Sequence, residues 1–327
     1  MSIVFWGTPE FATIILDTLI KNNYLPVAVV TASDKPVGRK KFLTPSPVKV
    51  LAQKHNLFIL QPEKIKENFN FKSEILNLKP DLFIVAAYGL ILPKEILDIP
   101  KYGSLNIHPS LLPKYRGASP IQATILNGDK ETGVTIILMD EKMDHGPILA
   151  WRKLEIQNSK ITYPELTEKL AKLGAELLIE TLPKWIKGEI KPIPQDDSKA
   201  TYTKIIKKED GKINWQKSAE EIERMIRAYY PWPGTYTYLK SQIPSTKSQI
   251  ISNFQKPKML KIIKAEVLKI NHQKEPGTVF LTENKKLAVT CGHDALILEE
   301  IQLEGKRQMT AQEFLNGHPE IIGTQLT

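Results

Sequence analysis

Cysteine is nearly absent from this sequence, in which Cys291 is the single example. One cysteine excludes an internal disulfide and a zinc site built from cysteines. The sequence also lacks any run of about 18 apolar residues, the length that a membrane-spanning helix requires. Its first residues, MSIVFWGTPEF, have no basic segment followed by a long apolar stretch. We therefore expect a soluble, cytoplasmic protein that does not cross a membrane.

A glycine fingerprint for dinucleotides is missing as well. The apolar run 2–6 predicts a buried strand, Gly7 predicts a turn, and Phe11, Ile14 and Leu19 follow at helical spacing. A dinucleotide fold would need G-x-G-x-x-G at this turn, and only Gly7 is present. This absence argues against a nicotinamide-dependent dehydrogenase.

Apolar runs that predict strands alternate with helical periods over the first half of the chain. The runs are residues 2–6, 27–30, 58–60, 81–87, 104–108, 133–139 and 148–156. This alternation predicts an α/β fold, a Rossmann-like domain with a mostly parallel sheet between helices. A helical period that begins near Thr162 continues to about Ile186, so we place the first domain at 1–188.

Two prolines and several small polar residues mark residues 189–205 as a linker. A second domain, 206–327, opens with a helix that Ser218 and Glu221 cap. Short apolar runs separated by turns follow it and predict a small β-barrel.

The formal net charge is +9. Residues 1–200 hold 26 basic against 22 acidic side chains, and residues 201–327 hold 19 against 14, so the shorter part carries the larger excess. A basic surface suits a polyanionic partner such as RNA, although many basic enzymes never bind nucleic acid. The loop 32–48 also concentrates positive charge, because Arg39, Lys40 and Lys41 follow one another in it. A long loop of this composition is either functional or simply solvated.

The stretch GSLNIHPSLLPKYRGASP, residues 103–120, carries the clearest chemistry. Asn106 and His108 are two apart, so on a strand they lie on the same face, and Pro109 ends that strand after His108. The loop MDHGP contributes Asp144. An amide donor, an imidazole and a carboxylate suit acyl transfer to an amine. Taken singly, these residues also fit a turn cap, a strand-end histidine and an Asx turn.

The string from Asn106 to Gly117, NIHPSLLPKYRG, together with Asp144, resembles the folate-dependent formyltransferases. Further segments are similar to the branch of that family that formylates methionyl initiator tRNA: GTPEFA at 7–12, AAYGLILP at 86–93 and YYPWPG at 229–234. The resemblance extends from Met1 to about residue 317. It implies a C-terminal OB-like domain that contacts tRNA.

The resemblance also implies a reaction. 10-Formyltetrahydrofolate would donate its formyl group to the α-amino group of methionyl initiator tRNA by direct attack, without a metal. Asn106 and His108 would stabilise the tetrahedral intermediate, and Asp144 would hold His108. The implied folate contacts are Ser110, Leu111, Leu112 and Pro113, with Leu90, Ile91 and Leu92 beside the pterin ring. Arg39, Lys40 and Lys41 would contact the acceptor end of the tRNA. We expect a monomer.

Two kinds of alternative stay open. The chain could formylate another amine, on a purine-pathway ribonucleotide or a nucleotide sugar. The purine enzyme resembles only the first domain, which would leave residues 206–327 unexplained. The basic loop argues against the sugar enzyme. It could also be an RNA-binding protein on an inactive formyltransferase scaffold, which the intact Asn106, His108 and Asp144 oppose.

Overall fold

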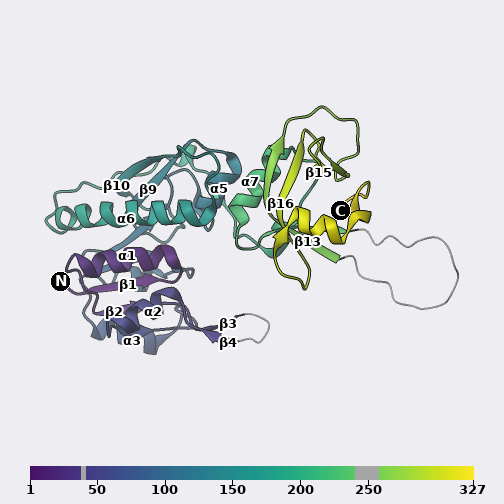
Figure 1. Ribbon diagram of the computed structural model, residues 1–327. Coiled ribbons are helices and arrows are strands. Elements are labelled where there is room, and N and C mark those ends of the chain that lie inside the picture. The colour runs from purple at the N-terminus through teal and green to yellow at the C-terminus, as the bar shows by residue number, and fades with distance from the viewer. Residues whose placement is uncertain (38–41, 240–257) are drawn as a thin grey trace. The chain divides into compact units, whose positions relative to one another are not determined.

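The structure is a computed structural model that describes residues 1–37, 42–239 and 258–327 (Figure 1). Arg39, Lys40 and Lys41, predicted to bind tRNA, lie outside the described residues. The chain forms two compact units. The first consists of Met1–Ala123, Asp129–Ser159 and Pro164–Ile205, and the second of Thr124–Gly128, Lys160–Tyr163 and Ile206–Thr327.

A seven-stranded sheet, in the order β10-β9-β7-β6-β1-β2-β5, forms the centre of the first unit. Neighbouring strands from β7 to β5 are parallel, whereas β9 is antiparallel to β7 and β10 is antiparallel to β9. The predicted mostly parallel sheet is therefore confirmed. The strands are β1 (Ile3–Gly7), β2 (Ala28–Val30), β5 (Phe58–Leu60), β6 (Leu82–Ala86), β7 (Ser104–His108), β9 (Glu131–Leu138) and β10 (Ile148–Glu155).

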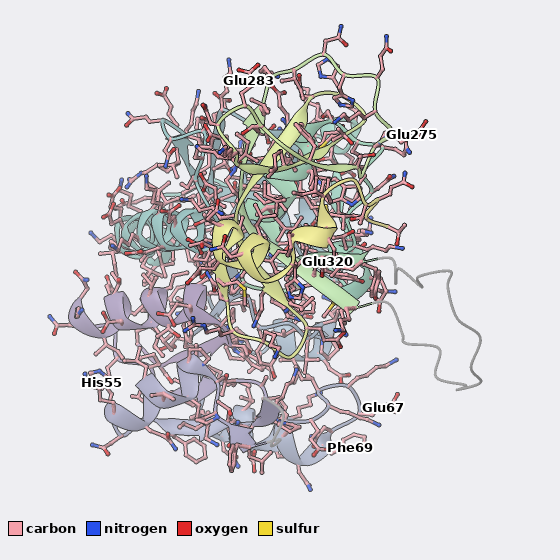
Figure 2. All side chains as sticks on the ribbon, turned by 45° about the vertical axis from the view of Figure 1, so that its right-hand side comes forward. His55, Glu67, Phe69, Glu275, Glu283 and Glu320 are labelled. Atoms are coloured by element: carbon pink, nitrogen blue, oxygen red, sulfur yellow. The ribbon has the colours of Figure 1, made fainter. Side chains whose placement is uncertain are left out.

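Helix α6 packs directly behind the strands that carry the candidate site. Its leucines Leu166 and Leu170 are fully buried, and each contributes about 2 kcal/mol to folding. A Cβ on Gly174 would lie 2.8 Å from Ile107 Cγ2, so the helix approaches β7 closely at this glycine. The helices that lie in the first unit are α1 (Glu10–Lys21), α2 (Pro47–Lys54), α3 (Phe69–Asn77), α4 (Lys94–Leu97), α6 (Tyr163–Ile186, apart from its first residue) and the 3-10 helix η1 (Asp197–Lys199). Helix α5 (Pro120–Asn127) is divided between the two units after Ala123. Phe69, the first residue of α3, lies at the outer edge of the ribbon (Figure 2).

The basic loop contains regular structure that the sequence did not predict. Strands β3 (Lys35–Val37) and β4 (Phe42–Thr44) pair antiparallel, with Lys35 opposite Thr44. Each arm has three residues, too few for an alternating apolar pattern to be visible. Asp34 anchors the base of this hairpin, because Lys49 Nζ donates to it at 2.8 Å. Hydrogen bonds from Gln61 and Lys49 hold the pKa of Asp34 below its ordinary value.

The second unit is built on one antiparallel sheet of six strands, β12-β13-β16-β15-β14 with β17 beside β16. The Ser218–Glu221 capping box forms as predicted and begins α7 (Ala219–Tyr229), whose apolar side packs into the core of this unit. The sheet agrees with the predicted OB-like β-domain. Its elements are β12 (Thr235–Leu239), β13 (Lys258–Leu268), β14 (Val279–Leu281), β15 (Leu287–Thr290), β16 (Ala295–Leu303), β17 (Met309–Thr310), α8 (Ala311–Gly317), η2 (Lys208–Gly211) and η3 (Pro319–Ile321).

No helix within the described ranges has the length and apolar character needed to cross a membrane.

Candidate active site

The three polar residues predicted to act together meet at the end of β7. Asn106 Nδ2 donates to Asp144 Oδ1 over 3.1 Å. His108 Nδ1 lies 3.6 Å from the same oxygen. Asn106 is 9% exposed and His108 is 4% exposed, so both side chains point into the protein. The alternation of side chains along β7 places Ile107 against α6 and turns Asn106 and His108 to the other face of the sheet.

Hydrogen bonds with the backbone fix which nitrogen of His108 carries a hydrogen and hold one carboxylate oxygen of Asp144. His108 Nε2 lies 2.9 Å from the carbonyl oxygen of Tyr115. A carbonyl oxygen only accepts, so Nε2 carries a hydrogen and donates it. Nδ1 is therefore the nitrogen that faces Asp144 and can exchange a proton there. The other carboxylate oxygen of Asp144, Oδ2, accepts from the N–H of Gly117 over 2.7 Å.

The loop between β9 and β10 presents Asp144 in a left-handed backbone conformation, with φ of 49°. Two residues later, a Cβ on Gly146 would lie 1.9 Å from the carbonyl oxygen of Leu138. Only glycine fits there. The close neighbour of this glycine is Leu138, the last residue of β9.

The segment from Ser110 to Pro113 follows His108 and folds back over β9. Thr135 Oγ1 donates to the carbonyl oxygen of Ser110 over 2.7 Å and accepts from the N–H of Leu112 over 3.1 Å. Ser110 is fully buried, and its hydroxyl donates to the carbonyl oxygen of Lys114. The N–H of Leu112 and the Ser110 hydroxyl are thus engaged within the protein. The Leu111 side chain, half-buried, touches Gly133 of β9, where a Cβ would lie 2.5 Å from Leu111 Cδ2.

The three apolar residues after β6 do not share one environment. Leu92 is 4% exposed and belongs to the core cluster that contains Trp6 and Tyr88. Leu90 and Ile91 are 44% and 75% exposed. Within the described part of the chain, the Trp6 indole nitrogen and the Tyr88 hydroxyl are buried without a hydrogen-bond partner. Burial also raises the pKa of Tyr88.

Two residues around this cluster were not assigned a role from the sequence. The Arg116 side chain is 1% exposed, and Gln195 reaches the Asp144 loop from the segment predicted as a linker. Arg116 lies inside the NIHPSLLPKYRG string, which gave a signal for it. Gln195 stands among prolines and acids that read as irregular structure, so no pattern pointed to it.

Residues 1–182, more than half of the chain, match a family described as formyl transferase. The chain belongs to the formyl transferase family. Residues 205–319 also match the C-terminal domain of formyl transferases. Two methionyl-tRNA formyltransferases are close in sequence to this family member. The protein from Caldanaerobacter subterraneus subsp. tengcongensis is 46% identical over 100% of both chains. The protein from Bacillus velezensis is 44% identical, covering 96% of this chain and 94% of its own.

Solved structures share the fold of this formyl transferase at low identity. The N-formyltransferase of Helicobacter canadensis, solved with folinic acid and dTDP-3-aminofucose, has a TM-score of 0.60 at 20% identity, covering 91% of this chain and 99% of that chain. HypX from Aquifex aeolicus, solved with tetrahydrofolic acid, has a TM-score of 0.62 at 16% identity, covering 98% of this chain and 48% of that chain.

Proposed function

We propose that the protein transfers the formyl group of 10-formyltetrahydrofolate to the α-amino group of methionyl initiator tRNA. The observation that carries the proposal is the meeting of Asn106, His108 and Asp144 around one carboxylate oxygen. Relatives that are 41–46% identical over nearly their whole length are named methionyl-tRNA formyltransferases, which supports the choice of substrate.

The reaction exchanges one carbon–nitrogen bond for another. The neutral α-amine attacks the formyl carbon, a tetrahedral oxyanion forms, and the bond to the folate nitrogen breaks. One proton leaves the amine, and one reaches the departing folate nitrogen. Neither step needs a covalent bond to the enzyme.

Each residue of the cluster has one task in this scheme. An amide nitrogen carries two hydrogens, so Asn106 keeps one on Asp144 and directs the other at the oxyanion. A donor of this kind is worth about 2.7–4 kcal/mol in other acyl-transfer sites. His108 acts through Nδ1, because Nε2 is held by Tyr115. Asp144 orients His108 across 3.6 Å, a separation that substrate binding often shortens in such sites.

The folate contacts follow from the atoms that remain available. The N–H of Leu112 and the hydroxyl of Ser110 are engaged internally. We therefore assign contact with the flat pterin and its aryl tail to the side chains of Leu111, Leu112 and Pro113, and not to these two polar groups. Leu90 and Ile91 would offer exposed apolar surface, while Leu92 supports them from the core.

For the tRNA, we propose Arg39, Lys40 and Lys41 as contacts of the acceptor end. The strand β4 that follows them exposes Phe42 and Leu43, at 68% and 72%.

We propose residues 1–188 as the catalytic domain, 189–205 as a linker and 206–327 as an OB-like tRNA-binding domain of a monomer. Lys264 in β13 already pairs with Glu299, and Lys269, just after β13, pairs with Glu220 and Asp294. These two lysines therefore contribute less to tRNA binding than the excess of positive charge in residues 201–327 suggests.

The test is an assay with 10-formyltetrahydrofolate and purified tRNAs. We expect formyl-methionine and free tetrahydrofolate in equal amounts with methionyl initiator tRNA, and far less with methionyl elongator tRNA. Formylation of an amino-sugar nucleotide or a purine ribonucleotide in place of the tRNA would overturn the proposal. Binding of initiator tRNA without release of tetrahydrofolate would point instead to an RNA-binding protein on an inactive scaffold.

A further inference from the structure

Residues 193–203, which we term the return segment, run along the candidate active site after α6 ends. Ile193 forms an antiparallel bridge with Ile148, the first residue of β10. Further on, β11 (Tyr202–Thr203) pairs in parallel with β8 (Arg116–Gly117). The return segment thus packs on both stretches that hold the catalytic cluster, the strip 115–117 and the loop before β10.

Gln195 of the return segment holds the backbone of the Asp144 loop. Its Nε2 donates to the carbonyl oxygens of Asp144 and Gly146, each over 2.8 Å. The amide nitrogen has two hydrogens, so each carbonyl receives one. These two carbonyls flank the turn in which Asp144 adopts a positive φ, a backbone conformation that residues other than glycine adopt less readily. Gln195 stabilises the conformation that delivers the Asp144 carboxylate.

Arg116 fixes the orientation of the Gln195 amide. Gln195 Oε1 accepts from Arg116 Nε over 3.0 Å and from Nη2 over 2.8 Å. A guanidinium only donates, so the amide oxygen must face Arg116 and the amide nitrogen must face the loop. Asp197 accepts from Nη2 over 2.8 Å and Tyr202 OH from Nη1 over 3.2 Å, both from the return segment.

The same strip also contacts the catalytic side chains directly. The Tyr115 carbonyl accepts from His108, and the Gly117 N–H donates to Asp144. Arg116 therefore stands between two backbone contacts to the catalytic cluster, and its side chain reaches the loop through Gln195.

We propose that Gln195 is a positioning residue for formyl transfer, oriented by Arg116 and acting through the Asp144 loop. The inference rests on the proposed function, because it takes its meaning from the role given to Asp144. A residue that merely fastens the return segment to the first unit would affect stability, whereas a positioning residue affects the rate of the chemical step.

Two substitutions separate the donor from the acceptor of the amide. Gln195→Met keeps the length and removes both, while Gln195→Glu keeps an oxygen for Arg116 and places another against two carbonyl oxygens. We expect the single-turnover rate to fall roughly 10- to 100-fold in both variants, because a misplacement of about 1 Å costs that much. The KM values for the folate and the tRNA should stay within about threefold. Asp196→Asn is the matched control, since Asp196 bonds to Ser198 and Lys199 within the same segment and should leave the rate unchanged.

A double-mutant cycle provides the decisive readout. With Asp144→Ala already present, the further change Gln195→Met should slow transfer by less than twofold, because the carboxylate that it positions is gone. An equal loss of rate in both backgrounds, or a wild-type rate in Gln195→Met, would refute the positioning role. In either case, a slow Asp144→Ala variant would still support the proposed function. A wild-type protein that formylates no tRNA would refute the proposed function, and with it the role of Gln195.

Discussion

The two carboxylate oxygens of Asp144 have different partners, and Asp144→Asn separates them. Oδ2 accepts from the Gly117 N–H over 2.7 Å. Oδ1 lies 3.1 Å from Asn106 Nδ2 and 3.6 Å from His108 Nδ1. The substituted amide has one oxygen, which the Gly117 N–H claims. Its nitrogen then faces the donor of Asn106 and the Nδ1 atom of His108.

This rearrangement blocks the proton path without changing the shape of the side chain. An amide N–H directed at Nδ1 occupies the lone pair of His108, whose Nε2 hydrogen is already committed to Tyr115. We expect kcat to fall roughly 10³- to 10⁴-fold, the size of loss found when an asparagine replaces the aspartate beside a catalytic histidine, because the amide cannot exchange a proton with Nδ1. The free energy of unfolding should drop by about 1–3 kcal/mol, because two buried donors face each other.

The assay is single-turnover formyl transfer to methionyl initiator tRNA with enzyme in excess, so that slow rates remain measurable. Glu141→Gln removes a charge from the same loop at an exposed position and is the matched control. A rate for Asp144→Asn within threefold of the wild type, in a protein with normal melting behaviour, would refute the proton path through Nδ1.

Three further outcomes test the packing around the site and in the second unit. Gly146→Ala should abolish transfer and destabilise the protein by at least about 1–3 kcal/mol, because its Cβ would meet the Leu138 carbonyl oxygen at 1.9 Å, and melting curves with activity assays measure both. Burial raises the pKa of the Cys291 thiol to about 12, so a thiol reagent at pH 8 should label it only after unfolding; fast labelling of the native protein would contradict this. Burial alone would raise the pKa of Asp294, but hydrogen bonds from Lys269 and neighbouring groups hold it below the ordinary value. Its stabilising contribution is thus present above about pH 4 and is lost as the pH falls through the lowered pKa, so Asp294→Asn should cost most near neutrality and little in acid, as denaturant titrations at several pH values will show.

Much of the central sheet could be predicted because buried parallel strands are continuous apolar runs. The runs at 81–87 and 104–108 became β6 and β7, with bounds shifted by at most two residues. The spacing of Asn106 and His108 placed both on one face for the same physical reason, the alternation of side chains along a strand. The antiparallel direction of β9 left no comparable mark, since a strand buried on both faces has the same pattern in either direction.

The approach of Asp144 to β7 was not contained in local spacing. It depends on the pairing of β9 with β7, which puts Leu138 at the end of β9 beside Leu105 near the start of β7. The loop after β9 then brings the Asp144 carboxylate to Asn106 and His108. The resemblance of the motif indicated that Asp144 acts beside the residues of β7, whereas the periodicity of the sequence did not. Neither the motif nor the periodicity pointed to Gln195, because its role comes from a side chain that reaches two carbonyl groups about fifty residues earlier in the chain. A linker-like composition predicts a segment without regular secondary structure, and it gives no information on what the side chains of that segment contact.

The central claim is that one amide, one imidazole and one carboxylate transfer a formyl group together. The most direct measurement is the single-turnover rate of formyl-methionine formation on initiator tRNA by Asn106→Ala, His108→Ala and Asp144→Ala, each shown by its melting curve to be folded. We predict that every variant loses at least about 100-fold in rate, because removing one oxyanion donor costs this much in other acyl-transfer enzymes and Asp144 holds the donor His108 in place. A near-normal rate in any one of the three folded variants would contradict the account.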